Sequence, residues 1–85
     1  MNQKEKLITR ILSLPKDFTY KEAVSLLGYL GYKEVRTGKT SGSRVRFIHE
    51  DGDQFVMHKP HPDKVLKSYL VAALAAVAIR RSNDA

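Results

Sequence analysis

The sequence predicts an α+β fold in which a three-stranded antiparallel sheet packs on helices, with an additional short helix at the N-terminus. Three observations predict this fold. Apolar side chains recur at helical spacing in three segments, a strand–turn–strand pattern lies between the second and the third of them, and 85 residues are enough for one modest hydrophobic core. We therefore expect a single domain over residues 1–85.

The N-terminal segment, residues 1–17, is expected to form the additional helix and a turn. Leu7 and Ile11 belong to an apolar stripe at helical spacing within residues 4–14. Pro15 then ends the helix, because proline cannot donate a backbone hydrogen bond and disfavours helical geometry in the residue before it.

The second helix begins at a capping box, in which Thr19 accepts a hydrogen bond from the amide of Glu22 and the Glu22 side chain reaches back. Its apolar stripe continues to Leu30. Gly31 follows at the position where a left-handed C-terminal cap favours glycine. These signals predict a helix that ends at about Leu30.

Three strands and a hairpin are expected after this helix. The strands cover residues 32–36, 43–49 and 54–58, with a polar loop at 37–42 and a turn at 50–52. The turn ends in Gly52, which adopts positive φ without a steric penalty.

The turn also fixes the register of the second and third strands. Matching their apolar faces places Phe47 opposite Phe55. By the same count, Arg44 lies opposite His58 on the other face of the sheet, with Arg46 one step further along that face. The sequence therefore predicts basic residues and an imidazole together on the face that the helices leave open.

The third helix is expected over residues 64–80, with Asp63 as its cap and a frayed tail at residues 81–85. It is apolar almost all round through residues 69–79. Outside its core stripe, the helix has an alanine and valine surface that could bind a partner protein or a second copy in a homodimer. The alternative is that the alanines are there only because alanine has a high helix propensity.

Composition limits the partners and the compartment. Fifteen Lys and Arg against nine Asp and Glu give a formal net charge of +6, which favours nucleic acid or an acidic protein as partner, although solubility alone also explains such an excess. Cysteine is absent, which fits a reducing compartment. The N-terminus lacks a secretory core and the longest apolar run is shorter than the roughly 20 residues of a membrane span. We expect a cytoplasmic protein with no membrane partner.

The short segment at residues 58–62 contains two imidazoles, a lysine and two prolines, and it leads into the final helix. Cleavage of RNA needs a group that accepts the ribose hydroxyl proton and cations that stabilise charge on the phosphate, and this segment offers both. His58 and His61 have no cysteine and no placed acidic ligand beside them, so we expect no metal and no cofactor. For the open sheet face, the alternative to binding of a phosphate backbone is that Arg44 and Arg46 are only the solvated half of an amphipathic strand.

Three segments carry a resemblance to a known family. They are Leu30-Gly31-Tyr32-Lys33-Glu34-Val35, Gly38-Lys39-Thr40-Ser41-Gly42-Ser43-Arg44-Val45-Arg46-Phe47 and His58-Lys59-Pro60-His61-Pro62. In this order they resemble the HicA toxins, mRNA interferases of bacterial type II toxin–antitoxin systems, over nearly the whole chain. The resemblance implies a fold like that of double-stranded-RNA-binding domains, cutting or blocking of mRNA without metal, and a HicB-like antitoxin as partner.

The resemblance also locates the site. Members of the HicA family commonly have the catalytic histidine directly after the Gly-Ser pair that opens the second strand. This chain has Arg44 at that position. Because arginine keeps its proton, we expect His58, opposite Arg44, to be the acid–base residue, with His61 as the second candidate. Contacts to RNA are expected from Lys39, Ser43, Arg44, Arg46 and Lys59. The alternatives are a non-catalytic RNA-binding module and a protein-interaction domain that uses the last helix.

Overall fold

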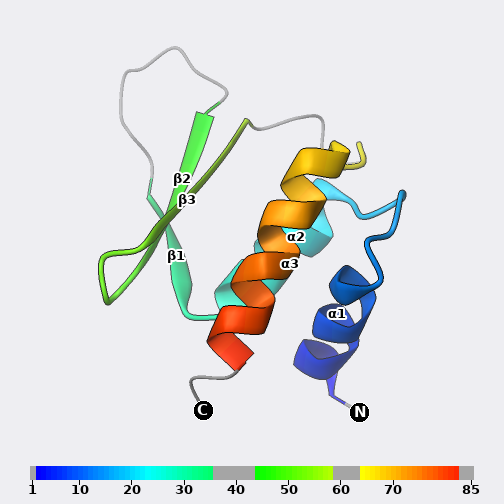
Figure 1. Ribbon diagram of the computed structural model, residues 1–85. Helices are drawn as coiled ribbons and strands as arrows, with labels where there is room; N and C mark the ends of the chain where they lie inside the picture. The colour runs from blue at the N-terminus through cyan, green and yellow to red at the C-terminus, as the bar shows by residue number, and fades with distance from the viewer. Residues whose placement is uncertain (1, 36–43, 59–63, 83–85) are drawn as a thin grey trace.

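The computed structural model describes residues 2–35, 44–58 and 64–82. In chain order its elements are α1 (Gln3–Leu12), α2 (Tyr20–Tyr29), β1 (Tyr32–Val35), β2 (Arg44–His49), β3 (Gln54–His58) and α3 (Ser68–Ser82) (Figure 1). The strands form one antiparallel sheet in the order β1-β2-β3. The predicted α+β fold is therefore confirmed. The predicted loop at 37–42 and the cap at Asp63 lie outside the described residues.

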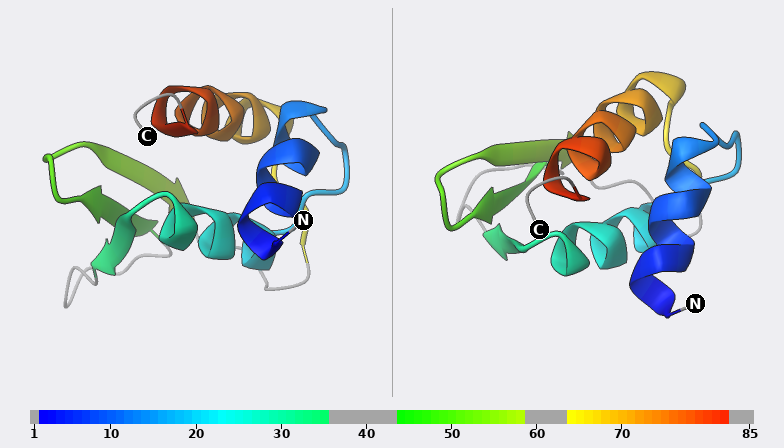
Figure 2. Two further views of the ribbon diagram at one scale, coloured as in Figure 1. Left: turned by 90° about the horizontal axis from the view of Figure 1, so that it is seen from below. Right: turned by 60° about the horizontal axis from the view of Figure 1, so that its bottom comes forward.

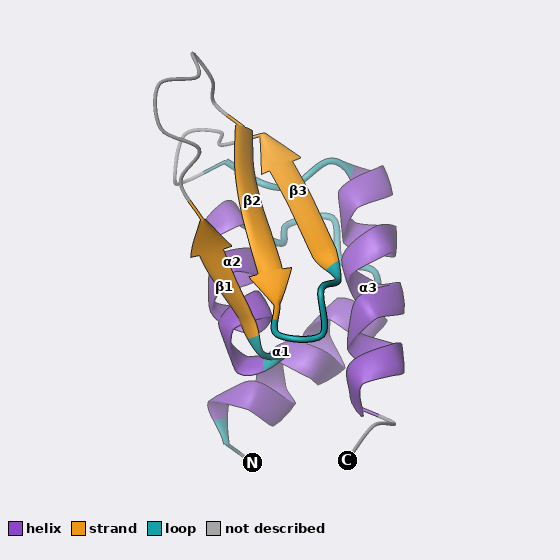
Figure 3. Ribbon diagram, turned by 90° about the vertical axis from the view of Figure 1, so that its left-hand side faces the viewer, coloured by secondary structure: helices purple, strands orange, loops and turns teal. Residues whose placement is uncertain are grey.

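The helices all lie on one side of the sheet. Helices α2 and α3 form a layer next to the strands, and α1 packs against both of them on the side away from the sheet (Figures 1 and 2). The largest fully buried side chains come from both layers: Phe18, Phe47, Ile11, Leu26, Leu27, Met57 and Leu74. One core thus joins the sheet to the helices, and the other face of the strands is left without a helix over it in the described part of the chain (Figure 3).

The predicted capping box begins α2. The hydroxyl oxygen of Thr19 accepts a hydrogen bond from the Glu22 amide at 3.1 Å, and the Glu22 carboxylate accepts one from the Thr19 amide at 3.0 Å. The same carboxylate accepts a hydrogen bond from Nε of Arg10 at 2.7 Å, which holds α1 to the start of α2. This hydrogen bond from Arg10 is the main reason why the pKa of the Glu22 carboxyl group is lowered.

Helix α1 ends at Leu12, two residues before the predicted end. Leu14 instead adopts a positive φ of 52° and is 57% exposed, so it is not part of the buried stripe. The amide of Leu14 donates to the carbonyl of Ile11 at 3.0 Å, which closes the last turn of the helix before Pro15.

Helix α3 begins at Ser68, four residues after the predicted start at residue 64. The carbonyl of Lys64 accepts a hydrogen bond from the Tyr20 amide at 3.1 Å, and the amide of Leu66 donates to the Phe18 carbonyl at 2.7 Å. Because these backbone groups pair with Phe18 and with Tyr20, the first residue of α2, they are not available for a helical turn. At its other end α3 continues to Ser82, so the part of the predicted tail that the structure describes is helical.

The β2–β3 hairpin has the predicted register. It pairs Arg44 with His58, Val45 with Met57, Arg46 with Val56, Phe47 with Phe55 and Ile48 with Gln54. Gly52 has a φ of 96° and donates from its amide to the His49 carbonyl at 2.8 Å, as the turn requires. The basic residues of β2 and the histidine of β3 are thus fixed relative to each other.

Candidate functional site

Figure 3 shows the face of the sheet that points away from the helices, and the described side chains of this face include basic residues. Side chains alternate along each strand, and the buried residues of β2 and β3 point to the helices. The register then places the following described residues on the open face: Lys33, Val35, Arg44, Arg46, Ile48, Gln54, Val56 and His58. None of the described side chains on this face is a carboxylate, so its charge is positive.

His58 and Arg44 form the last pair of the β2–β3 ladder. Both are exposed, and the Cβ atoms of such directly opposed residues lie about 4.5–5.5 Å apart. Arg46 lies one pair further along the same face and is partly buried. The structure therefore brings together three residues of the predicted site. The other predicted site residues, Lys39, Ser43, Lys59 and His61, lie outside the described residues.

His58 also lines a pocket of about 280 Å³ between the end of β3 and the start of α3. Its polar lining comes from His58, Lys64, Lys67 and Tyr69, and its apolar lining from Val65, Leu66 and Leu70. Both lysines were missed as site residues because the sequence pattern assigned them to a helix beginning at residue 64, and the tyrosine was missed because Tyr69 was counted with the apolar surface of that helix. The sequence shows the spacing of the two lysines. Their position in the same pocket as His58 depends on the backbone hydrogen bonds of residues 64–66, which delay the start of α3 to Ser68.

The acidic residues of the hairpin turn lie at the opposite end of the β2–β3 pair. Asp51 accepts a hydrogen bond from Nη1 of Arg81 at 2.6 Å, and Asp53 accepts one from Nη2 of Arg80 at 2.6 Å and another from the Tyr32 hydroxyl. The guanidinium group of Arg81 also lies 5.3 Å from the centre of the Tyr32 ring. These contacts join the end of α3 to the hairpin and pair Asp51 and Asp53 with cations at the end of the β2–β3 ladder opposite His58.

Both aspartates have a lowered pKa, Asp51 mainly through Arg81 and Asp53 mainly through the Tyr32 hydroxyl. The stability that such pairs contribute is present above the unfolded-state pKa of about 3.9 and is lost as pH falls through the lower folded-state pKa. We expect the free energy of unfolding, measured by urea denaturation, to fall from about pH 5 to pH 2.

The variant Asp51→Asn should be less stable than the wild type at pH 7 and should show a smaller loss between pH 7 and pH 2. Glu50→Gln is the matched control, because it removes a carboxylate from the same turn and keeps both aspartates. A wild-type acid profile in Asp51→Asn would show that the Arg81 pair does not stabilise the fold.

His49, the remaining histidine, occupies a structural position. Its ring contacts the Tyr32 ring edge-on, with centroids 5.2 Å apart, and its Nδ1 accepts a hydrogen bond from the Asp51 amide at 3.2 Å. Only 17% of its side chain is exposed, on the helix side of the sheet. The structure thus separates His49 from the open face that carries His58.

The fold and the site define a small α+β protein that presents a basic sheet face ending in a histidine. The family described as HicA toxin of bacterial toxin-antitoxin matches residues 20–79, from the first residue of α2 into α3. The chain belongs to the HicA toxin family, as the sequence motifs predicted. Membership makes it a toxin of a toxin–antitoxin system, and the family in general implies an antitoxin as partner. Neither a curated protein nor a solved structure matches the chain.

Among the described residues, no cluster of His, Asp and Glu side chains is suited to hold a metal ion. In the same part of the chain, no helix combines the length and the apolar character that crossing a membrane demands.

Proposed function

We propose that this toxin binds mRNA on the open sheet face and cleaves it by acid–base catalysis without a metal, with His58 as the residue that moves the proton. The observation that carries the proposal is the pairing of His58 with Arg44 on an exposed face where none of the described side chains is a carboxylate. An imidazole changes its charge near neutral pH, and a guanidinium group binds phosphate bidentately. The pair therefore combines the two groups that RNA cleavage needs.

In the proposed reaction the ribose 2′-oxygen attacks the adjacent phosphorus and the neutral imidazole of His58 accepts the hydroxyl proton. Arg44 and Arg46 stabilise the negative charge that develops on the phosphate oxygens. The bond from phosphorus to the 5′-oxygen then breaks, and that oxygen receives a proton from a protonated group of the site. His61 is the second candidate, after His58, for the acid–base residue. The products are a 2′,3′-cyclic phosphate and a free 5′-hydroxyl group.

The register supports His58 in place of the family's usual histidine. That histidine commonly follows the Gly-Ser pair, where this chain has Gly42-Ser43-Arg44. Because His58 is the direct cross-strand neighbour of Arg44, an imidazole on β3 reaches nearly the same place as one on β2. Both chemical groups are therefore present at this place, the guanidinium group on β2 and the imidazole on β3.

The proposal extends to the remaining partners. We infer that Lys39, Ser43 and Lys59 add contacts to the RNA, that the antitoxin is HicB-like, and that the protein works in the cytoplasm as a single domain. A homodimer through the exposed alanines of α3 stays a prediction, and the molecular mass of the protein in solution would test it.

The test is incubation of the purified, antitoxin-free protein with a transcribed mRNA in the presence of EDTA. We expect cleavage, with cyclic phosphate ends on the fragments and wild-type rates in EDTA. Intact RNA together with salt-sensitive binding would indicate a non-catalytic RNA-binding module. A failure to bind RNA even at low salt would indicate a protein-interaction domain.

A further inference from the structure

We propose that the pocket beside His58 holds one unpaired base of a single-stranded RNA substrate, stacked on Tyr69, so that the neighbouring phosphate lies at His58. This inference rests on the proposed function and assigns a role to residues that neither the motifs nor the family match singles out. It starts from a side chain that the core does not use.

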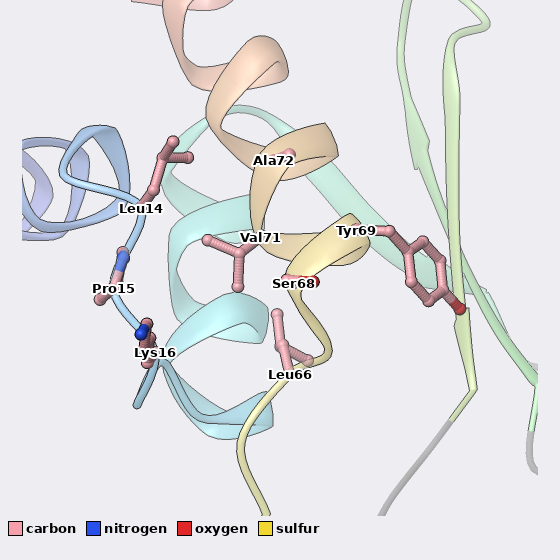
Figure 4. Close-up of a pocket in the computed structure, with 8 residues that line it drawn as sticks. All are labelled: Leu14, Pro15, Lys16, Leu66, Ser68, Tyr69, Val71 and Ala72. Atoms are coloured by element: carbon pink, nitrogen blue, oxygen red, sulfur yellow. The ribbon is translucent and has the colours of Figure 1, made fainter.

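Tyr69 is the second residue of α3, and 61% of it is exposed. Figure 4 shows its side chain extending from the first turn of α3 toward the strands, whereas Val71 points away from them toward the segment of Leu14. A single exposed aromatic residue needs no explanation. Tyr69, however, lines the same pocket as His58, so a ligand in this pocket would be next to both residues.

The remaining lining of the pocket suits a nucleobase between two phosphates. Val65, Leu66 and Leu70 provide an apolar surface for a flat ring, and Lys64 and Lys67 provide cations for the backbone on either side of it. Aromatic rings interspersed with cations are the usual way in which proteins hold single-stranded nucleic acid. The positive end of the α3 dipole, at Ser68, adds to the attraction for phosphate.

The size of the pocket favours a base over a larger ligand. Its volume of about 280 Å³ lies just below the roughly 300–1,000 Å³ of pockets that enclose whole small-molecule ligands. The bases of a double helix remain stacked and paired, so that only a single-stranded segment can place a base in such a pocket. The substrate class is therefore single-stranded mRNA, with the cleaved phosphate next to the bound base.

The experiment compares the binding of two fluorescein-labelled oligomers by the whole protein. Both have 2′-O-methyl riboses, which remove the attacking hydroxyl and prevent cleavage, and one carries adenine bases while the other is abasic. We expect the wild type to bind the adenine oligomer about 10-fold more tightly, since stacking of one base on an aromatic ring commonly changes affinity by about 5- to 150-fold.

Three variants assign this preference to the ring. Tyr69→Ala should bind both oligomers equally, and Tyr69→Phe should keep the preference because stacking needs only the ring. Tyr29→Ala is the matched control, because Tyr29 is also exposed but lies at the end of α2, and this variant should keep the preference. Since Tyr69 is exposed, its replacement should leave the thermal unfolding temperature nearly unchanged.

The outcomes separate this inference from the proposed function. If the wild type prefers neither oligomer, or if Tyr69→Ala keeps the preference, the base pocket is wrong, whether or not the wild type cleaves mRNA. If the preference depends on Tyr69 while the wild type leaves mRNA intact, the pocket stands as a binding site and the cleavage reaction is wrong.

Discussion

His58→Ala is expected to reduce the rate of mRNA cleavage by about 10²–10⁴-fold, the range that a positioned general acid or base commonly contributes. Expression of this variant should no longer arrest growth. The side chain is exposed at the end of β3 and is not part of the core, so the fold should be retained. The measurement is the single-turnover cleavage rate of a labelled transcript in EDTA, with thermal unfolding as the check on folding.

Two further variants make this result specific. Gln54→Ala is the matched control, because Gln54 is also exposed on the open face of β3 but lies at the hairpin end, and its cleavage rate should stay within about 3-fold of the wild type. In the second, Arg44→His is added to His58→Ala, which moves the imidazole to the paired position on β2. Because the two positions are direct neighbours, part of the lost rate should return. A folded His58→Ala protein with the wild-type rate would show that another group moves the proton.

The parts of the fold that depend on neighbouring residues were predictable from the sequence. Thr19 and Glu22 form the expected capping box, and Gly31 and Gly52 have positive φ where a helix cap and a turn require it. The hairpin register followed from its turn and its alternating side chains, and it correctly placed Arg44 opposite His58. These features share one physical reason, because each is determined within a few residues of the chain.

The parts that were missed depend on contacts between distant segments. The extended course of residues 64–66 results from hydrogen bonds to Phe18 and Tyr20, for which the sequence near Lys64 carries no signal. The side chains of Lys67 and Tyr69 came to lie beside His58 only through that pairing. The local sequence supports a helix over the apolar run, and most of that helix is present as α3. Its first residue differs, because the long-range hydrogen bonds keep residues 64–66 out of the helix.

Net charge was another property whose distribution the sequence did not show. The sequence gives +6 for the whole chain but does not reveal which acidic groups are paired. In the structure Arg80 and Arg81 pair with Asp53 and Asp51 at the hairpin turn. These two carboxylates are thus paired at that end, whereas the described residues Arg44 and Lys64 keep the end with His58 positive. This separation is what makes one end of the sheet attractive to a phosphate backbone.

Gly31→Ala is expected to destabilise the protein by about 2–4 kcal/mol, because it combines a strained backbone with an overpacked contact. Gly31 has a φ of 96°, and a Cβ atom there would lie 2.8 Å from Nε2 and 2.9 Å from Cδ2 of His49. The His49 ring cannot turn aside freely, since it packs against Tyr32 and accepts a hydrogen bond from Asp51. Against the roughly 5–15 kcal/mol by which whole domains are stable, this is a large loss. Urea denaturation at pH 7 measures it.

Gly52→Ala separates the two causes, because Gly52 has the same φ of 96° but open space where the Cβ atom would lie. It should cost only the backbone term of about 1–2 kcal/mol. In a His49→Ala background the contact is gone, so Gly31→Ala should then cost about as much as Gly52→Ala does in the wild type. Equal losses for the two glycine variants in the wild type would show that the His49 ring moves aside at little cost. The junction between α2 and β1 would then depend on backbone conformation alone, and His49 would not restrict the residue at position 31.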